Sequence, residues 1–159
     1  MDRLEIIETL KGFPAALEAE IAGLPEAVLR FKPAEDEWSI REVLGHVRLA
    51  DDIWYKRLYQ VWSLSDPVLM TWTGEEEALE RARQISNPNT LISELRASRP
   101  RIVDLLAHAV DWTRIGQWRG EGRRSLKQLA EYLVSHDADH INQIRNLKAA
   151  AAQTAGSRP

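Results

Sequence analysis

Apolar residues recur every three or four positions in four stretches of the chain, the pattern of a helix that buries one face. The stretch 39–62 has the clearest start. Ser39 with Glu42 three positions later forms a capping-box sequence, and Trp38 and Val43 flank it as a hydrophobic staple. A long helix is therefore predicted to begin at Ser39. Its buried face would carry Ile40, Val43, Leu44, Val47, Ile53, Trp54, Leu58 and Val61.

The last of the four stretches opens in the same way, with Ser125 and, three positions later, Gln128. One stripe then runs to about residue 148 and contains two histidines among its apolar residues: Leu126, Leu129, Leu133, His136, His140, Ile144 and Leu147. The other two helices are predicted over about 2–22 and about 90–110. Pro14 and Pro100 lie inside them, and we expect each proline to kink or split its helix.

These stretches predict an all-α fold, a four-helix bundle, with one further short acidic helix within 74–85. No segment shows the alternation of a β-strand. We expect 111–124 to be a loop over the end of the bundle, with Trp112 and Trp118 as an apolar lid. Residues 1–150 are expected to form a single domain, followed by a disordered tail over 151–159.

Composition removes several classes of function. The net charge of -3 arises from acidic and basic residues mixed along the chain, so no basic face is available to bind nucleic acid. The chain has no cysteine, which excludes disulfides, thiolate ligands and a cysteine nucleophile. It shows no signal peptide and no apolar run long enough to cross a membrane, so a cytoplasmic location is expected.

Three of the four histidines fall on apolar helix faces. His136 and His140 are four residues apart, so their side chains lie one above the other on one face. His46 lies within the apolar stripe of 39–62. A single histidine in such a place is usually a hydrogen-bonded core residue, but three buried imidazoles need partners, and one shared cation satisfies all three. His108, near the end of its helix, is better explained by the helix dipole.

Two segments resemble the DinB/YfiT-like superfamily, namely EWSIREVLGHVRLADDIWYKRL and SLKQLAEYLVSHDADHINQI. Its members show a W-S-x-x-E-φ-φ-x-H start on the second helix, matched here from Trp38 to His46. They also show H-x-x-x-H-x-x-Q-φ on the last helix, matched here from His136 to Ile144. The resemblance spans roughly 4–148.

The resemblance implies an up-down-down-up bundle, often a homodimer, with one metal ion bound by His46, His136 and His140. The superfamily often has Glu near the position of Asp52, which makes Asp52 a candidate acid or base. Gln143 is the second candidate, as a residue that orients a ligand or a water molecule. Some relatives are S-transferases that use low-molecular-weight thiols such as bacillithiol or mycothiol, and others look like hydrolases or isomerases.

Three histidines leave a coordination position open, as in catalytic rather than structural sites. Zn²⁺ and Ni²⁺ suit imidazole best, with Fe²⁺ and Mn²⁺ as alternatives. Two classes of function remain open. One is an enzyme that activates a thiol or water against a small-molecule substrate, either an S-transferase or a hydrolase. The other is a non-catalytic bundle, in which the metal or the histidine cluster serves stability, sensing or assembly.

Overall fold

The structure, a computed structural model, describes residues 1–157 and is mostly helical. In chain order its elements are α1 (Arg3–Ile21), α2 (Glu26–Leu29), α3 (Ile40–Ser63), α4 (Glu75–Gln84), α5 (Asn89–His108), β1 (Ile115–Trp118), β2 (Gly122–Ser125) and α6 (Leu126–Gly156).

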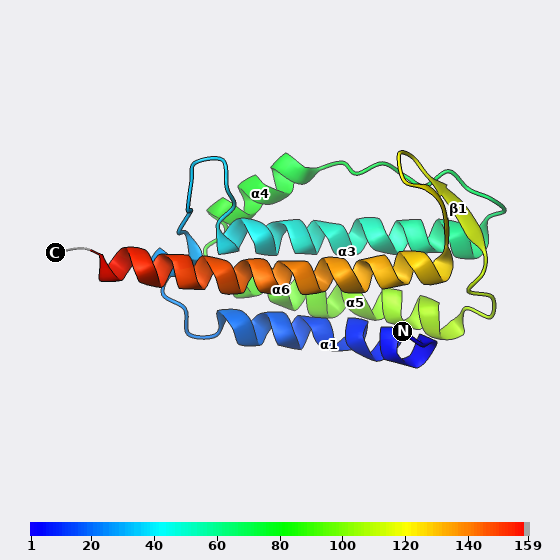
Figure 1. Ribbon diagram of the computed structural model, residues 1–159, viewed down its shortest axis with the longest axis horizontal. Coiled ribbons are helices and arrows are strands. Elements are labelled where there is room, and N and C mark those ends of the chain that lie inside the picture. Colours follow the sequence, from blue (N-terminus) through cyan, green and yellow to red (C-terminus); the bar gives the residue numbers. More distant parts are fainter. Residues whose placement is uncertain (158–159) are drawn as a thin grey trace.

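The four long helices α1, α3, α5 and α6 form an elongated bundle (Figure 1). Along its long axis α1 and α6 run in one direction, whereas α3 and α5 run in the other, so the order is up-down-down-up. Two consecutive long helices can be parallel only if the chain returns between them. The segment that contains α4 makes this return along the outside of α3, and α4 packs against α3.

Both predicted capping boxes are present. The hydroxyl of Ser39 accepts a hydrogen bond from the backbone N–H of Glu42, and the Glu42 carboxylate accepts one from Ser39 in return. Ser125 and Gln128 form the same pair at the start of α6. The two caps therefore fix where the helices that carry the histidines begin.

Neither proline splits its helix, because α5 continues through Pro100 and α1 through Pro14. A kink at either proline stays an expectation. The span 111–124 is not a plain loop, because β1 and β2 pair there as an antiparallel hairpin. Gly120 and Gly122 adopt positive φ in and beside its turn, a conformation that costs glycine little. The short polar strands showed no alternation that would have revealed them.

The expected disordered tail over 151–159 is wrong for residues 151–156, because α6 extends to Gly156. Its end protrudes beyond the other helices (Figure 1). The segment is rich in alanine, the strongest helix former, so it can remain helical with little packing. Residues 158 and 159 lie outside the described part of the chain.

Close contact between α3 and α4 depends on one glycine. A Cβ built on Gly45 would lie 2.6 Å from the Cβ of Ala82 and 2.7 Å from the carbonyl oxygen of Ala78. The missing side chain lets α4 lie directly on α3, beside His46. This approach brings the first turn of α4 close to the histidines.

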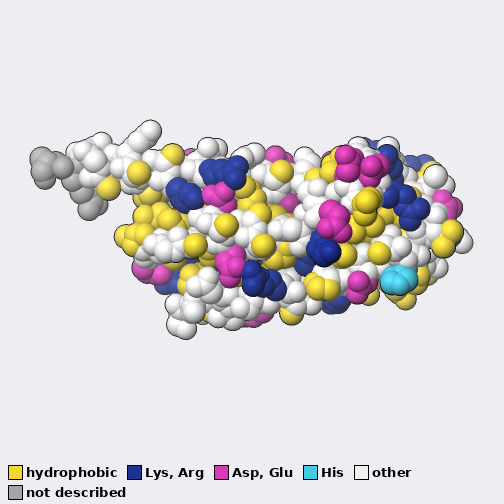
Figure 2. All heavy atoms as spheres, turned by 90° about the horizontal axis from the view of Figure 1, so that it is seen from below, with side chains coloured by type: hydrophobic (Ala, Val, Ile, Leu, Met, Phe, Trp, Pro, Cys, Tyr) yellow, Lys and Arg dark blue, Asp and Glu magenta, His cyan; other side chains and the backbone are white. Residues whose placement is uncertain are grey.

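Basic and acidic side chains alternate with apolar ones over the face shown in Figure 2, and neither charge forms a continuous field there. None of the helices within residues 1–157 combines the length and apolarity needed to cross a membrane.

Candidate metal site

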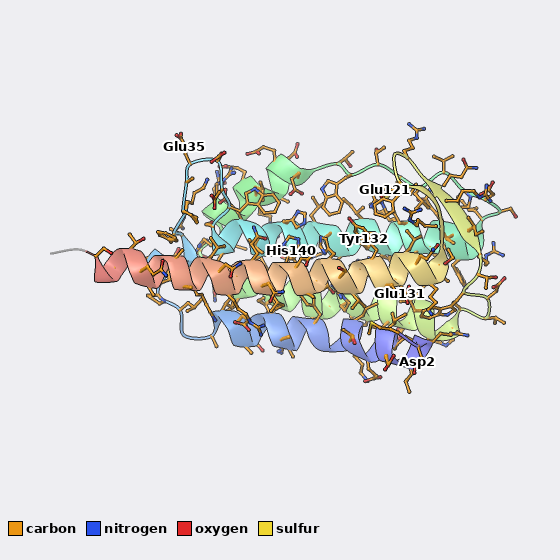
Figure 3. All side chains as sticks on the ribbon, in the orientation of Figure 1. Asp2, Glu35, Glu121, Glu131, Tyr132 and His140 are labelled. Carbon is orange, nitrogen blue, oxygen red and sulfur yellow. The ribbon has the colours of Figure 1, made fainter. Side chains whose placement is uncertain are left out.

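The three predicted histidines converge between α3 and α6. The Nε2 atom of His136 lies 3.1 Å from Nε2 of His46 and 3.2 Å from Nε2 of His140. One nitrogen from each ring can be chosen so that all three lie within 4.8 Å of one another. His140 is labelled on α6 in Figure 3. These three residues are the ones that the sequence singled out.

In His46 and His140, a hydrogen-bond partner outside the histidine cluster determines which ring nitrogen carries the proton. The Nδ1 atom of His46 lies 2.6 Å from Oε1 of Glu75, and a carboxylate can only accept, so Nδ1–H donates and Nε2 keeps its lone pair. Nδ1 of His140 lies 2.8 Å from Oε1 of Gln143, which gives the same tautomer. Both lone pairs then face His136. Such outer partners commonly orient metal-binding histidines.

Burial favours the neutral form of two of the imidazoles, those of His140 and His46. It lowers the pKa of His140 to about 4, with a further contribution from neighbouring His136. Burial also lowers the pKa of His46, although Glu75 acts in the opposite direction. Neutral imidazole is the form that binds metal ions, so the environment favours the binding-competent state.

The donor set fits a divalent transition metal. The Nε2 atom of His136 can carry at most one proton, which cannot satisfy two facing lone pairs. A cation at the point of convergence would satisfy all three rings. With metal–nitrogen distances of about 2.0–2.1 Å, tetrahedral ligand atoms lie roughly 3.3 Å apart, close to the two separations found here. His46, His136 and His140 would hold the ion, and three protein ligands leave a position open.

A buried ionic network lies behind His136. The Arg99 guanidinium donates from Nε to Asp51 Oδ1 at 2.7 Å and from its terminal nitrogens to the carboxylate of Asp137, the residue after His136. Ser98 donates to the other oxygen of Asp51. All of these side chains are at least 94% buried. The network ties α3, α5 and α6 together beneath the site.

The two candidate catalytic residues differ in position. Gln143 accepts a hydrogen bond from Nδ1 of His140, which fixes the orientation of that ring. Asp52 is not brought to the histidines; it forms ion pairs with Arg48 and Arg101 on another face of α3, and we assign it no catalytic role. His108 is exposed at the end of α5 and donates to the carbonyl of Asp104, away from the site as expected.

Tryptophans surround the histidines. Trp72 stacks on His46 with ring centroids 5.0 Å apart, and Trp38 lies 4.8 Å from His46 on another side. Trp72 also donates from Nε1 to Glu75 at 2.8 Å, which holds that carboxylate in place. Trp112 is not part of a lid, because it is buried in the core at the hairpin end. Trp118 is half-buried beside Trp54.

Sequence reasoning missed Glu75 and Trp72. Both come from the return segment and the start of α4, far from the histidines in the chain. The run GEEE that begins α4 was visible as a helix start, but any of its three carboxylates could have faced α3. Only the approach of α4 at Gly45 selects Glu75.

Comparison with known proteins agrees with the fold. Among solved structures, YfiT from Bacillus subtilis, described as a probable metal-dependent hydrolase with an unusual four-helix bundle topology, superposes with a TM-score of 0.83 at 19% identity. The match covers 92% of this chain and 86% of YfiT. No curated protein matches. The sequence profile of the DinB superfamily matches residues 9–144, and the chain therefore belongs to the DinB superfamily.

Proposed function

We propose that this protein is a metal-dependent hydrolase that acts on a small-molecule substrate, with Zn²⁺ or Ni²⁺ held by His46, His136 and His140. The observation that carries the proposal is the convergence of the three imidazoles, of which burial favours the neutral form at His46 and His140. Three protein ligands would leave a position open for water. A divalent ion bound there lowers the pKa of a water or thiol that it binds, which supplies a nucleophile near pH 7.

The residues around the ion have separate tasks. Glu75 and Gln143 hold the imidazoles of His46 and His140 in the binding tautomer. Trp72 and Trp38 cover His46 and restrict the access of bulk water. A cavity of about 620 Å³ is lined by Trp38 and Gln143, which contact His46 and His140, and it provides room for a small substrate.

A low-molecular-weight thiol is the second candidate for the nucleophile, which would make the protein an S-transferase. The specific reason is that the chain has no cysteine, so a thiol bound by the ion has to come from outside. The assay should therefore contain both alternatives, water alone and water with a thiol.

Metal analysis and turnover test the proposal together. The purified protein is loaded with Zn²⁺ or Ni²⁺ and assayed with a panel of activated esters and amides, with and without added thiols. His136→Ala should remove stoichiometric metal and lower turnover at least 100-fold, whereas His108→Ala, the matched control, should change neither. Metal binding without turnover of any substrate would favour a non-catalytic role, and equal metal content in both variants would refute the site.

Stability gives an independent readout of the same site. At a free-ion concentration of 100 times Kd, binding adds about 2.7 kcal/mol to the free energy of unfolding. For a chain of this size that raises Tm by roughly 5–10 °C. The gain should be absent in His136→Ala and retained in His108→Ala. We also expect a homodimer, which sedimentation of the loaded protein measures.

A further inference from the structure

Arg57 is a buried cation in an unusual environment. Only 4% of it is exposed. Its guanidinium carbon lies 5.2 Å from the ring centroid of Trp54, 5.9 Å from that of Trp72 and 5.0 Å from that of Trp118. Tyr132, labelled in Figure 3, contacts two of these indoles and closes the cluster. We call these four aromatic residues the tryptophan cage.

Arg57 has no anionic partner within residues 1–157. Its one hydrogen bond runs from Nε to the carbonyl oxygen of Met70 at 3.2 Å. Burial lowers the pKa of Arg57, and the one group that acts against burial is Tyr132, not a carboxylate. The other deeply buried arginines have acidic partners, Arg41 one carboxylate and Arg99 two. The terminal nitrogens of Arg57 are free to donate, and they are not fully enclosed.

The tryptophan cage connects Arg57 to the histidines. Trp72 contacts the guanidinium and also stacks on His46. Trp54 contacts the guanidinium, and its ring centroid is 6.5 Å from that of His136. A single aromatic ring therefore separates Arg57 from the imidazoles. Arg57 follows His46 by eleven positions on α3, close to three full turns, so both project from the same face.

The charge around the site is uneven. On the side of Trp38 the cavity is lined by Asp36, Glu37 and Asp139, which would repel an anion. Further along α3 lies the unpaired charge of Arg57, and both oxygens of the Glu75 carboxylate at this side accept hydrogen bonds, from His46 and from Trp72. A substrate whose reacting group lies at the histidines can therefore place an anionic group more favourably toward the tryptophan cage than toward the cavity.

We propose that Arg57 determines substrate specificity by binding an anionic group, such as a carboxylate, phosphate or sulfonate, carried by the substrate at the end remote from its reacting bond. Planar guanidinium forms paired hydrogen bonds with such groups, and the low polarity of the cage strengthens them. The structural alternative is that Arg57 only anchors the return segment through its hydrogen bond to Met70. The inference rests on the proposed function, because the histidines supply the reacting end.

The test uses Co²⁺-loaded protein, whose visible bands report the metal and whose thiolate charge-transfer band reports a bound thiol. The probes are mercaptocarboxylic acids of increasing chain length and the mercaptoalcohols of matched length. Absorbance and calorimetry give both affinities. At the optimal length the acid should bind about tenfold more tightly than the alcohol.

Arg57→Gln should abolish this preference without weakening the binding of the alcohol, and Arg57→Lys should retain part of it. Arg119→Gln removes an exposed arginine of the hairpin and should leave the preference intact. Thermal melting shows whether each variant folds; if Arg57→Gln does not, the wild type and Arg57→Lys still provide the comparison.

The outcomes separate the two proposals. Failure to bind cobalt at His46, His136 and His140 refutes the metal site and this inference with it. Cobalt binding with equal affinities for acid and alcohol leaves the metal site standing and overturns the role of Arg57. A preference that survives in folded Arg57→Gln, or calorimetry that detects no binding of any acid, overturns it as well.

Discussion

Replacing Arg99 by methionine should destabilise the bundle strongly. The substitution roughly preserves the volume of the side chain but removes the one cation between Asp51 and Asp137. Both carboxylates would then remain buried without a counter-ion. Arg101→Met on the same helix is the matched control, because Arg101 is exposed and pairs with Asp52 at the surface.

The size of the effect follows from burial. Removing one partner of a buried ion pair costs about 3–5 kcal/mol, whereas an exposed pair contributes about 0–1 kcal/mol. For a chain of this length the first cost lowers Tm by roughly 6–20 °C. Arg101→Met should change Tm by no more than a few degrees.

Lowering the pH should reduce the loss of stability that Arg99→Met causes. Burial already raises the pKa of Asp51 above its usual value, against the effect of Arg99. Without the guanidinium that pKa rises further. A folded-state pKa above the unfolded value means that the native state takes up protons preferentially, so stability is regained as pH falls. Thermal unfolding of both variants at about pH 7 and pH 4.5 tests this. Equal losses in the two variants, or a deficit for Arg99→Met that grows in acid, would refute the reasoning.

Three further substitutions can be checked by denaturant unfolding. Gly45→Ala should destabilise by about 1–3 kcal/mol, because the new methyl group overlaps Ala82 and pushes α4 away from α3. Gly12→Ala, whose methyl group meets nothing within 4 Å inside α1, should instead stabilise by about 0.5–1 kcal/mol. Glu42→Gln should cost about 1–3 kcal/mol near pH 7. Burial alone would raise the pKa of Glu42, but its hydrogen bonds hold it below the usual value. Its contribution is therefore present above about pH 4.5 and lost as pH falls through the folded-state pKa, so wild type and Glu42→Gln should converge in acid.

Local signals made the helices predictable. The boxes at Ser39 and Ser125 act within four residues, so sequence placed the starts of α3 and α6 correctly. The hairpin was missed because its short strands are held by contacts outside themselves. Leu69, for example, donates its backbone N–H to the carbonyl of Gln117, almost fifty residues later. A residue pattern read along the chain does not contain that information.

The residues of the candidate site also fall into those that the sequence could predict and those that it could not. The histidines were predictable because spacing on a helix fixes which face a side chain occupies. Their partner Glu75 and the surroundings of Arg57 were not predictable, since both depend on the return segment, which carries Trp72. Trp72 in particular contacts both His46 and Arg57. Asp52 is the opposite case, because the resemblance suggested it whereas in the structure it pairs with Arg48 and Arg101.

The distance along the chain between His46 and His136, 90 residues, has a consequence for folding. In the unfolded chain only His136 and His140 are near each other, so an ion meets two ligands at most. The third ligand, His46, comes close to the other two only after α3 and α6 have packed. A bound ion then closes a loop of 90 residues. Cross-links that close long loops remove much entropy from the unfolded ensemble. In a chain without disulfides, the metal would act as a reversible cross-link that forms late in folding and slows unfolding.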